Sequence, residues 1–370
     1  MVPRARLLHT LAHGLVLGMV GACGGIPQTE PGAVEALRAQ IQSLEARLRT
    51  AEAEKTQTAA ILQRARGAIA YVRGAYTFVD AEGRPLRHVL NDVGEPVADP
   101  HGVPLADVLG TGPIAVVNYC GTAFLVGRQG ELLTNRHMAQ PWWADEASAP
   151  LLAAGMRPVF LVLRAFFQER IGAVPLEVLR VDPTKDIALV RTAGWAPSAE
   201  PLPLYPESEP LEDGQPVILM GYPTGLDAML ARLETPERLA LEAGGAYNYA
   251  TVEYLARTHQ LRPSVTGGFL WEVLPNTLTY DARTARGGSG GPLLDRFGRV
   301  IGVNEAYLPD FQGGNYAVPI RFGQALLKSG GIVAAAPTHE TPELLAPPPA
   351  VHDRPLARGN ADPPVRENGR

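Results

Sequence analysis

The sequence has little of three things: cysteine, net positive charge and long apolar runs. Only two cysteines, Cys23 and Cys120, occur among its 370 residues. The formal net charge is −5, and a nucleic-acid-binding surface needs a basic stripe, so nucleic acid is excluded as a partner. No apolar run of the roughly 20 residues that cross a bilayer occurs after the N-terminal segment. We therefore expect a soluble mature body that binds no nucleic acid.

The N-terminal residues have the organisation of an export signal. Two arginines precede an apolar stretch, residues 7–20, and small residues then precede Cys23. This pattern predicts a secretory signal over residues 1–22 and is similar to a lipobox, in which the cysteine accepts a lipid; a plain signal peptide cleaved nearby is the alternative. We expect an exported protein of the periplasm or cell envelope, anchored to a membrane through Cys23. Gly24, which is not the aspartate that marks inner-membrane retention in some bacteria, favours the outer membrane.

Cys120 is the only cysteine left if Cys23 carries a lipid, so no intrachain disulfide is expected. It ends an apolar stretch, VVNYC. Because cysteine is commonly a small core residue, we expect a buried, inert thiol rather than a catalytic one.

Residues 32–66 carry apolar side chains spaced alternately by three and four. Such heptad spacing, with polar side chains between, predicts a long helix with one apolar seam. Three interpretations remain: an oligomerising coiled coil, a stalk that holds the body off a membrane, and a helix folded back on its own domain. Self-association into a homo-oligomer is favoured, because an isolated seam leaves its apolar side chains in water. The seam consists of Val34, Leu37, Ile41, Leu44, Leu48 and Ala51.

A loose repeat follows, with copies at residues 80–86, 91–97 and 99–105. Each copy begins with Asp or Asn and has Gly fourth and Pro sixth, which is turn chemistry. We expect successive hairpin turns that lead into a β-rich body. The acidic residues match no known calcium-loop spacing, so we expect no metal and no cofactor.

The sequence GGSGGPL surrounds one serine with glycines. Gly287, Gly288, Gly290 and Gly291 flank Ser289, and glycine tolerates the sharp turns that leave a hydroxyl exposed beside free N–H groups. A serine hydroxyl is a poor nucleophile until a base removes its proton, and its attack creates an oxyanion that needs hydrogen-bond donors. A histidine and an acid are therefore required elsewhere in the chain.

His137 and Asp186 are the base and the acid that the chain supplies. His137 follows two expected strands joined by a turn, which would fix it at the edge of a sheet. Asp186 precedes a short apolar strand, residues 187–190, and this place suits a buried carboxylate that holds an imidazole. Asp182 is the competing acid, but it precedes a proline and is typical of a turn.

These three residues lie in motifs that resemble those of the trypsin-like serine peptidases, in particular the bacterial HtrA/Deg group. The group has sequences close to TNxH, DIAL and GNSGGPL, and this chain has TNRH, DIAL and GGSGGPL around His137, Asp186 and Ser289. GYPTG, YDA, VIGVN and NYAVPI extend the resemblance, which runs from about residue 115 to about residue 327. Three motifs in the correct order are a specific signal, whereas any one alone is weak.

The resemblance implies an all-β, chymotrypsin-like fold of two antiparallel β-barrels within a domain over residues 67–332. The first barrel is expected at about residues 113–195 and the second at about 212–332, with the site in the cleft between them. The resemblance also implies that the backbone N–H groups of Gly287 and Ser289 form the oxyanion hole. The PDZ domains that often follow in the family are not expected here, nor is cage-like assembly of the Deg kind.

Two regions depart from the family pattern. Residues 226–262 replace a short loop with two expected helical segments, broken near Gly244 and Gly245. We interpret this insertion either as a regulatory lid beside the cleft or as a surface elaboration. Residues 334–370 are rich in proline, alanine and charge and poor in large apolar residues, which predicts a disordered tail.

By the same resemblance, the substrate pocket is lined by residues just before the serine and by the strand after VIG. In trypsin-like enzymes that cleave after basic residues, an acid lies six positions before the serine, where this chain has Arg283. Cleavage after Lys or Arg is therefore not supported, although Glu305 could contribute, and small or medium apolar residues are the family default. The expected pocket residues are Arg283, Thr284, Arg286, Asn304, Glu305 and Ala306.

The sequence thus favours a serine endopeptidase that cleaves envelope or secreted polypeptides through an acyl-enzyme intermediate. His137 would take the proton of Ser289, and Asp186 would fix the imidazole tautomer. A catalytically inactive peptidase fold that serves as an envelope scaffold or chaperone is the alternative. An esterase for small acyl groups is a third interpretation.

Overall fold

The computed structural model describes residues 31–143, 145–223, 225–243, 249–307 and 314–329. The chain divides into two compact units between Gln57 and Thr58, and each is described by itself. The expected export signal with Cys23 and the tail expected over residues 334–370 lie outside the described residues. None of the helices within the described ranges is long and apolar enough to cross a membrane.

Helix α2 (Pro31–Gly67) confirms the helix expected at residues 32–66. The end of α2 belongs to the second unit, where Ile61 and Ala65 are buried. The earlier seam residues of α2 remain between 47% and 59% exposed: Leu37, Ile41, Leu44 and Leu48.

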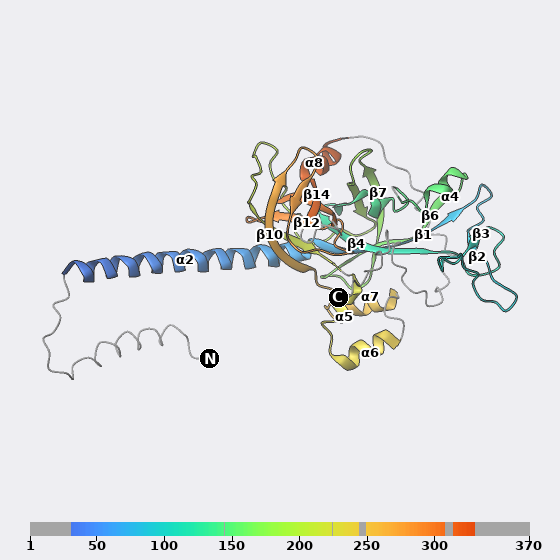
Figure 1. Cartoon of the computed structure of the whole chain (residues 1–370), viewed down its shortest axis with the longest axis horizontal. Coiled ribbons are helices and arrows are strands. Elements are labelled where there is room, and N and C mark those ends of the chain that lie inside the picture. The colour runs from blue at the N-terminus through green and yellow to red at the C-terminus, as the bar shows by residue number, and fades with distance from the viewer. Residues whose placement is uncertain (1–30, 144, 224, 244–248, 308–313, 330–370) are drawn as a thin grey trace, which may run out of the picture. The chain divides into compact units, whose positions relative to one another are not determined.

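The two expected antiparallel barrels are both present in the second unit, each closed and built from six strands (Figure 1). The first barrel has the strand order β1-β4-β5-β8-β7-β6. Its strands are β1 (Ile69–Val79), β4 (Val117–Leu125), β5 (Glu131–Thr134), β6 (Arg157–Phe167), β7 (Val174–Val181) and β8 (Ala188–Thr192). Two short helices, α3 (Arg136–Ala139) and α4 (Ala149–Ala153), interrupt it.

Strand β1 makes the first barrel begin earlier than the boundary of about residue 113 expected from the sequence. It pairs with β4 on one side and β6 on the other, and all its residues except Arg73 are buried. The two partners of β1 lie far away along the chain, so its own residues do not show that it belongs to the barrel.

The three repeats between β1 and β4 form three similar turns, as expected. In each, a glycine at the fourth position with φ of about +80° donates its N–H to the carbonyl of the first residue, as Gly83 does to Asp80 at 3.1 Å. The leading Asp or Asn side chain also accepts backbone N–H groups. A two-stranded sheet, β2 (Arg87–His88) with β3 (Ala106–Asp107), joins the repeats.

The second barrel has the strand order β10-β11-β14-β13-β12-β9 and ends at helix α8 (Ile320–Lys328). The insertion expected over residues 226–262 holds three short helices rather than two: α5 (Leu226–Leu230), α6 (Thr235–Ala243) and α7 (Tyr249–Arg257). The strands are β9 (Pro216–Gly221), β10 (Ser264–Val273), β11 (Leu278–Tyr280), β12 (Pro292–Asp295), β13 (Val300–Tyr307) and β14 (Asn315–Pro319).

Aromatic side chains join the two barrels. Tyr71 on β1 meets Tyr222, just after β9, edge to face with ring centroids 5.4 Å apart, and both are buried. Phe166 packs against the other side of Tyr71 at 6.2 Å. Burial of each such ring contributes roughly 1.5–3 kcal/mol relative to exposure. This shared core fixes the first barrel against the second where the candidate site forms.

Candidate active site

His137 and Asp186 lie at adjacent strand ends of the first barrel. His137 is in α3, directly after β5, and Asp186 directly precedes β8; the two strands pair, with Thr134 opposite Ala188. One oxygen of Asp186 accepts the backbone N–H of His137 at 2.9 Å, and the other lies 2.6 Å from the ring Nδ1. The carboxylate is buried and the imidazole is half-buried. A buried carboxylate that makes these two hydrogen bonds fixes the orientation of the ring.

Asn135 and Arg136 brace this pair from the same TNRH segment. The buried Asn135 amide donates to the carbonyl of Asp186 at 2.8 Å. Arg136 donates to the carbonyls of Asp182 and Pro183 at 2.9 Å and lies over the ring of Trp143. Asn135 and Arg136 were not among the site residues predicted from the sequence. Their position inside the motif was a signal, but their partners lie about fifty residues further on.

Asp182 occupies a separate turn. Its carboxylate accepts the backbone N–H groups of Thr184 and Lys185, both at 2.8 Å, and the hydroxyl of Thr184. These bonds are local, so the side chain of Asp182 serves the turn, whereas that of Asp186 faces His137.

Ser289 lies in a glycine-rich loop between β11 and β12. Its hydroxyl donates to the carbonyl of Glu305 on β13 at 3.2 Å, not to the ring of His137. The Ser289 carbonyl and the Met138 side chain, next to His137, both border Gly121 on β4. The loop therefore lies against the first barrel beside α3, close to the His137–Asp186 pair.

Some backbone N–H groups of this loop are hydrogen-bonded and others are free. Gly288 donates to Ala285, Gly290 to Asn304 and Gly291 to Gly288. In the part of the chain that the structure describes, the N–H groups of Gly287 and Ser289 have no acceptor. Two free donors beside one hydroxyl match what an oxyanion needs.

Residues 121–303 match the family model of the trypsin-like peptidase domain. The chain carries a trypsin-like peptidase domain. It is 29% identical over 208 residues to the putative serine protease HhoB of Synechocystis sp., a match that covers 55% of this chain and 38% of HhoB. It is 31% identical over 136 residues to the serine protease Rv3671c of Mycobacterium tuberculosis, covering 36% of this chain and 28% of that protein. The chain thus spans well under half the length of these curated relatives.

Among solved structures, the active form of the Rv3671c protease from M. tuberculosis superposes with a TM-score of 0.41 at 15% identity. That match covers 74% of this chain and 85% of the other.

Glu305 joins the two halves of the site in the peptidase domain. It is the extra residue of a β-bulge, because Asn304 and Ala306 pair with the consecutive residues Ala317 and Tyr316. Bulges re-aim a side chain next to many active sites. Burial raises the pKa of the Glu305 carboxyl, the charge of Asp186 raises it further, and His137 and Lys185 oppose the rise. Its carbonyl holds Ser289 while its carboxyl responds to the charges of the base and the acid.

The other pocket residues expected in the peptidase domain do not gather around Ser289 as one group: some are buried and others are exposed. Asn304 is buried and donates to the hydroxyl of Thr284 at 3.4 Å, so these two meet beneath the loop. Arg283 and Arg286 are exposed. The side chain of Ala306 lies outside the described part of the chain.

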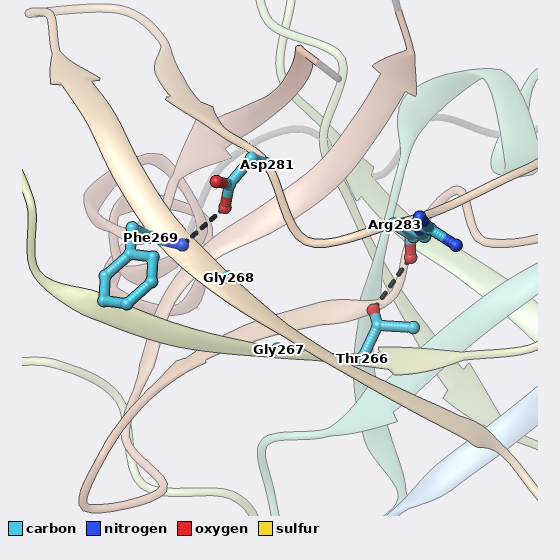
Figure 2. Close-up of a pocket in the computed structure, with 6 residues that line it drawn as sticks. All are labelled: Thr266, Gly267, Gly268, Phe269, Asp281 and Arg283. Atoms are coloured by element: carbon cyan, nitrogen blue, oxygen red, sulfur yellow. Dashed lines mark hydrogen bonds between the residues drawn. The ribbon is translucent and has the colours of Figure 1, made fainter. Parts of the chain in front are cut away.

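Arg283 borders a surface pocket of about 390 Å³ on the second barrel. The hydroxyl of Thr266 donates to the carbonyl of Arg283 at 2.8 Å, and the N–H of Phe269 donates to the carboxylate of Asp281 at 2.6 Å; both bonds are drawn in Figure 2. Within the described ranges, no group of three or more His, Cys, Asp or Glu residues is arranged to hold a metal ion.

Proposed function

We propose that this chain is a serine endopeptidase with Ser289 as nucleophile, His137 as general base and Asp186 as the acid that orients His137. The observation that carries the proposal is the His137–Asp186 pair, joined by two hydrogen bonds, beside a serine loop with two free N–H groups. The substrates we propose are envelope or secreted polypeptides, in line with the proteases to which the chain is similar.

The proposed reaction has two stages. Ser289 Oγ attacks the peptide carbonyl carbon while His137 takes the hydroxyl proton, and the N–H groups of Gly287 and Ser289 bind the oxyanion. His137 then gives that proton to the leaving amine, which departs and leaves an acyl-serine ester. A water molecule then attacks the carbonyl carbon of the ester while His137 takes its proton, and His137 gives that proton to Ser289 Oγ as the acid product leaves.

Replacement of the nucleophile tests this proposal. Ser289→Ala should lower the turnover of unfolded protein substrates by a factor on the order of 10⁴ to 10⁶, with an unchanged melting temperature. A serine-reactive phosphonate should label the wild type and not the variant. Undiminished turnover by Ser289→Ala would refute the assignment.

An inactive scaffold is the second candidate. The bond from Ser289 to the Glu305 carbonyl favours it, because this bond turns the hydroxyl away from the base. A wild-type chain that the phosphonate does not label, and that still binds unfolded polypeptides, would replace the endopeptidase proposal with this one. Turnover of small ester substrates without turnover of peptides would instead favour the esterase interpretation.

We further propose export, lipid anchoring at Cys23 in the outer membrane, and self-association through residues 32–66. The exposed seam of α2 supports the last of these. Metabolic labelling with a fatty acid should mark the wild type and not Cys23→Ala, and unlabelled wild type would exclude the anchor.

Light scattering of the chain with and without residues 32–57 should give a multimer and a monomer; two monomers would exclude self-association.

A further inference from the structure

Thr122 on β4 is fully buried at the junction of the two barrels, and each of its polar atoms makes a hydrogen bond. Its N–H donates to the carbonyl of Ser289 at 2.8 Å, and its carbonyl accepts the hydroxyl of Thr134 at 2.7 Å. Its own hydroxyl donates to the carbonyl of Gly287 at 2.8 Å and accepts the N–H of Tyr222 at 3.1 Å. One first-barrel residue therefore touches both residues whose N–H groups are free.

The direction of these bonds is fixed by chemistry. An amide N–H only donates and a carbonyl only accepts, so the Thr122 hydroxyl must accept from Tyr222 and give its single proton to Gly287. The hydroxyl cannot rotate to another partner without leaving a buried donor or acceptor unpaired. It thus holds the Gly287 carbonyl toward the first barrel.

The loop that Thr122 contacts needs such a restraint. Gly287 and Gly290 have φ of +84° and +81°, and glycine backbones populate many conformations of similar energy. Only the orientation in which the Gly287 carbonyl points to Thr122 is secured by this bond, and in that orientation the N–H groups of Gly287 and Ser289 stay free.

We propose that Thr122 is a positioning residue of the peptidase, which holds the peptide group that joins Gly287 to Gly288, between the two oxyanion donors, and so keeps both donors in place. This inference rests on the proposed peptidase function. Thr122 does not touch the substrate; its hydroxyl orders the loop that does. Its loss therefore affects the transition state, where the oxyanion exists, more than the binding of the substrate.

Thr122→Val tests this, since valine keeps the shape and removes the hydroxyl. We expect kcat to fall about 10- to 100-fold, less than or equal to the loss of one direct oxyanion donor, while KM changes less than about threefold. The affinity for a peptide boronate, whose adduct places an oxygen in the same hole, should fall by the same factor as kcat/KM. Thr122→Ser, which keeps the hydroxyl, should retain most of the activity.

Thr77→Val is the matched control. Thr77 is a buried threonine on β1 whose hydroxyl donates to the carbonyl of Ala115 at 2.8 Å, so its loss also leaves a buried acceptor unpaired. It should lower the melting temperature without changing kcat. If Thr122→Val fails to fold, Thr122→Cys replaces it, because a thiol is a weaker donor than a hydroxyl. Its kcat should be lower than that of Thr122→Ser and of Thr77→Val, but above zero.

Two outcomes would overturn the inference: a folded Thr122→Val with kcat within about twofold of wild type, or a Thr122→Ser as impaired as the valine or cysteine variant. Failure of the proposed function is distinguishable, because it would show as undiminished turnover by Ser289→Ala, whatever the threonine variants do.

Discussion

The two barrels supply their halves of the candidate site in opposite ways. In the first barrel, both carboxylate oxygens and the carbonyl of Asp186 are bonded, to His137 and Asn135. In the second, the loop around Ser289 has two N–H groups without an acceptor among the described residues. The acid of the first half is held in place because all its oxygens accept hydrogen bonds, whereas the second half is useful because two of its N–H donors are left open. Each half should therefore fail differently when it is altered.

The largest effect is expected when the hydrogen bonds between Asp186 and His137 are altered. Asp186→Asn keeps the size of the side chain but presents an NH₂ group either to the ring Nδ1 or to the backbone N–H of His137, where only an acceptor fits. The wrong imidazole tautomer is then favoured, and kcat should fall by about 10⁴. Steady-state turnover of a peptide substrate measures this.

Asp182→Asn is the control for that substitution. Asparagine caps turns as well as aspartate does, and the carboxylate of Asp182 accepts only local groups, so turnover should stay near that of wild type. An Asp186→Asn variant within tenfold of wild type, or an equal loss in Asp182→Asn, would contradict the assignment of the acid.

A smaller effect is expected when a side chain is added to the loop around Ser289. Gly287 has φ of +84°, and a Cβ there would lie 2.5 Å from the carbonyl oxygen of Tyr222. Gly287→Ala must therefore move the loop and misplace one donor, and we expect kcat to fall about 10²- to 10³-fold. Parallel measurements of kcat and of the melting temperature check this.

Gly83→Ala separates backbone strain from this loss of function. Gly83 has nearly the same φ, +82°, but a Cβ there would meet no atom within 4 Å. Both alanines should cost about 1–2 kcal/mol of stability for the left-handed conformation, and only that at Gly287 should lower kcat. Equal kcat values for the two variants would mean that the position of Gly287 does not matter for turnover.

The sequence predicted the local parts of this site and not the long-range parts. The turn around Asp182, the repeats after β1 and the contexts of His137 and Ser289 depend on neighbours in the chain, so their residue types suffice. Thr122 binds groups 100 and 165 positions away, and nothing near it in the sequence identifies Tyr222 or Gly287. The beginning of the first barrel was missed for the same reason, because β1 is recognised as part of it only by its distant partners.

The smallest expected effect concerns Glu305, which belongs to the second barrel but acts on the first. Burial, and then the charge of Asp186, raise the pKa of Glu305 above its ordinary value of 4.5. The folded chain therefore holds this proton more tightly than the unfolded chain, so the contribution of Glu305 to stability falls as pH rises from 4.5 through the raised pKa. Glu305→Gln should be more stable than wild type above that range and similar below it, as thermal unfolding at several pH values would show.

Glu131→Gln is the control, because it removes a glutamate on β5 whose carboxylate accepts the backbone N–H of Gln129 at 3.0 Å, and it should show no such gain in stability. A Glu305→Gln variant no more stable than wild type at high pH would show that burial does not raise the pKa of the Glu305 carboxyl.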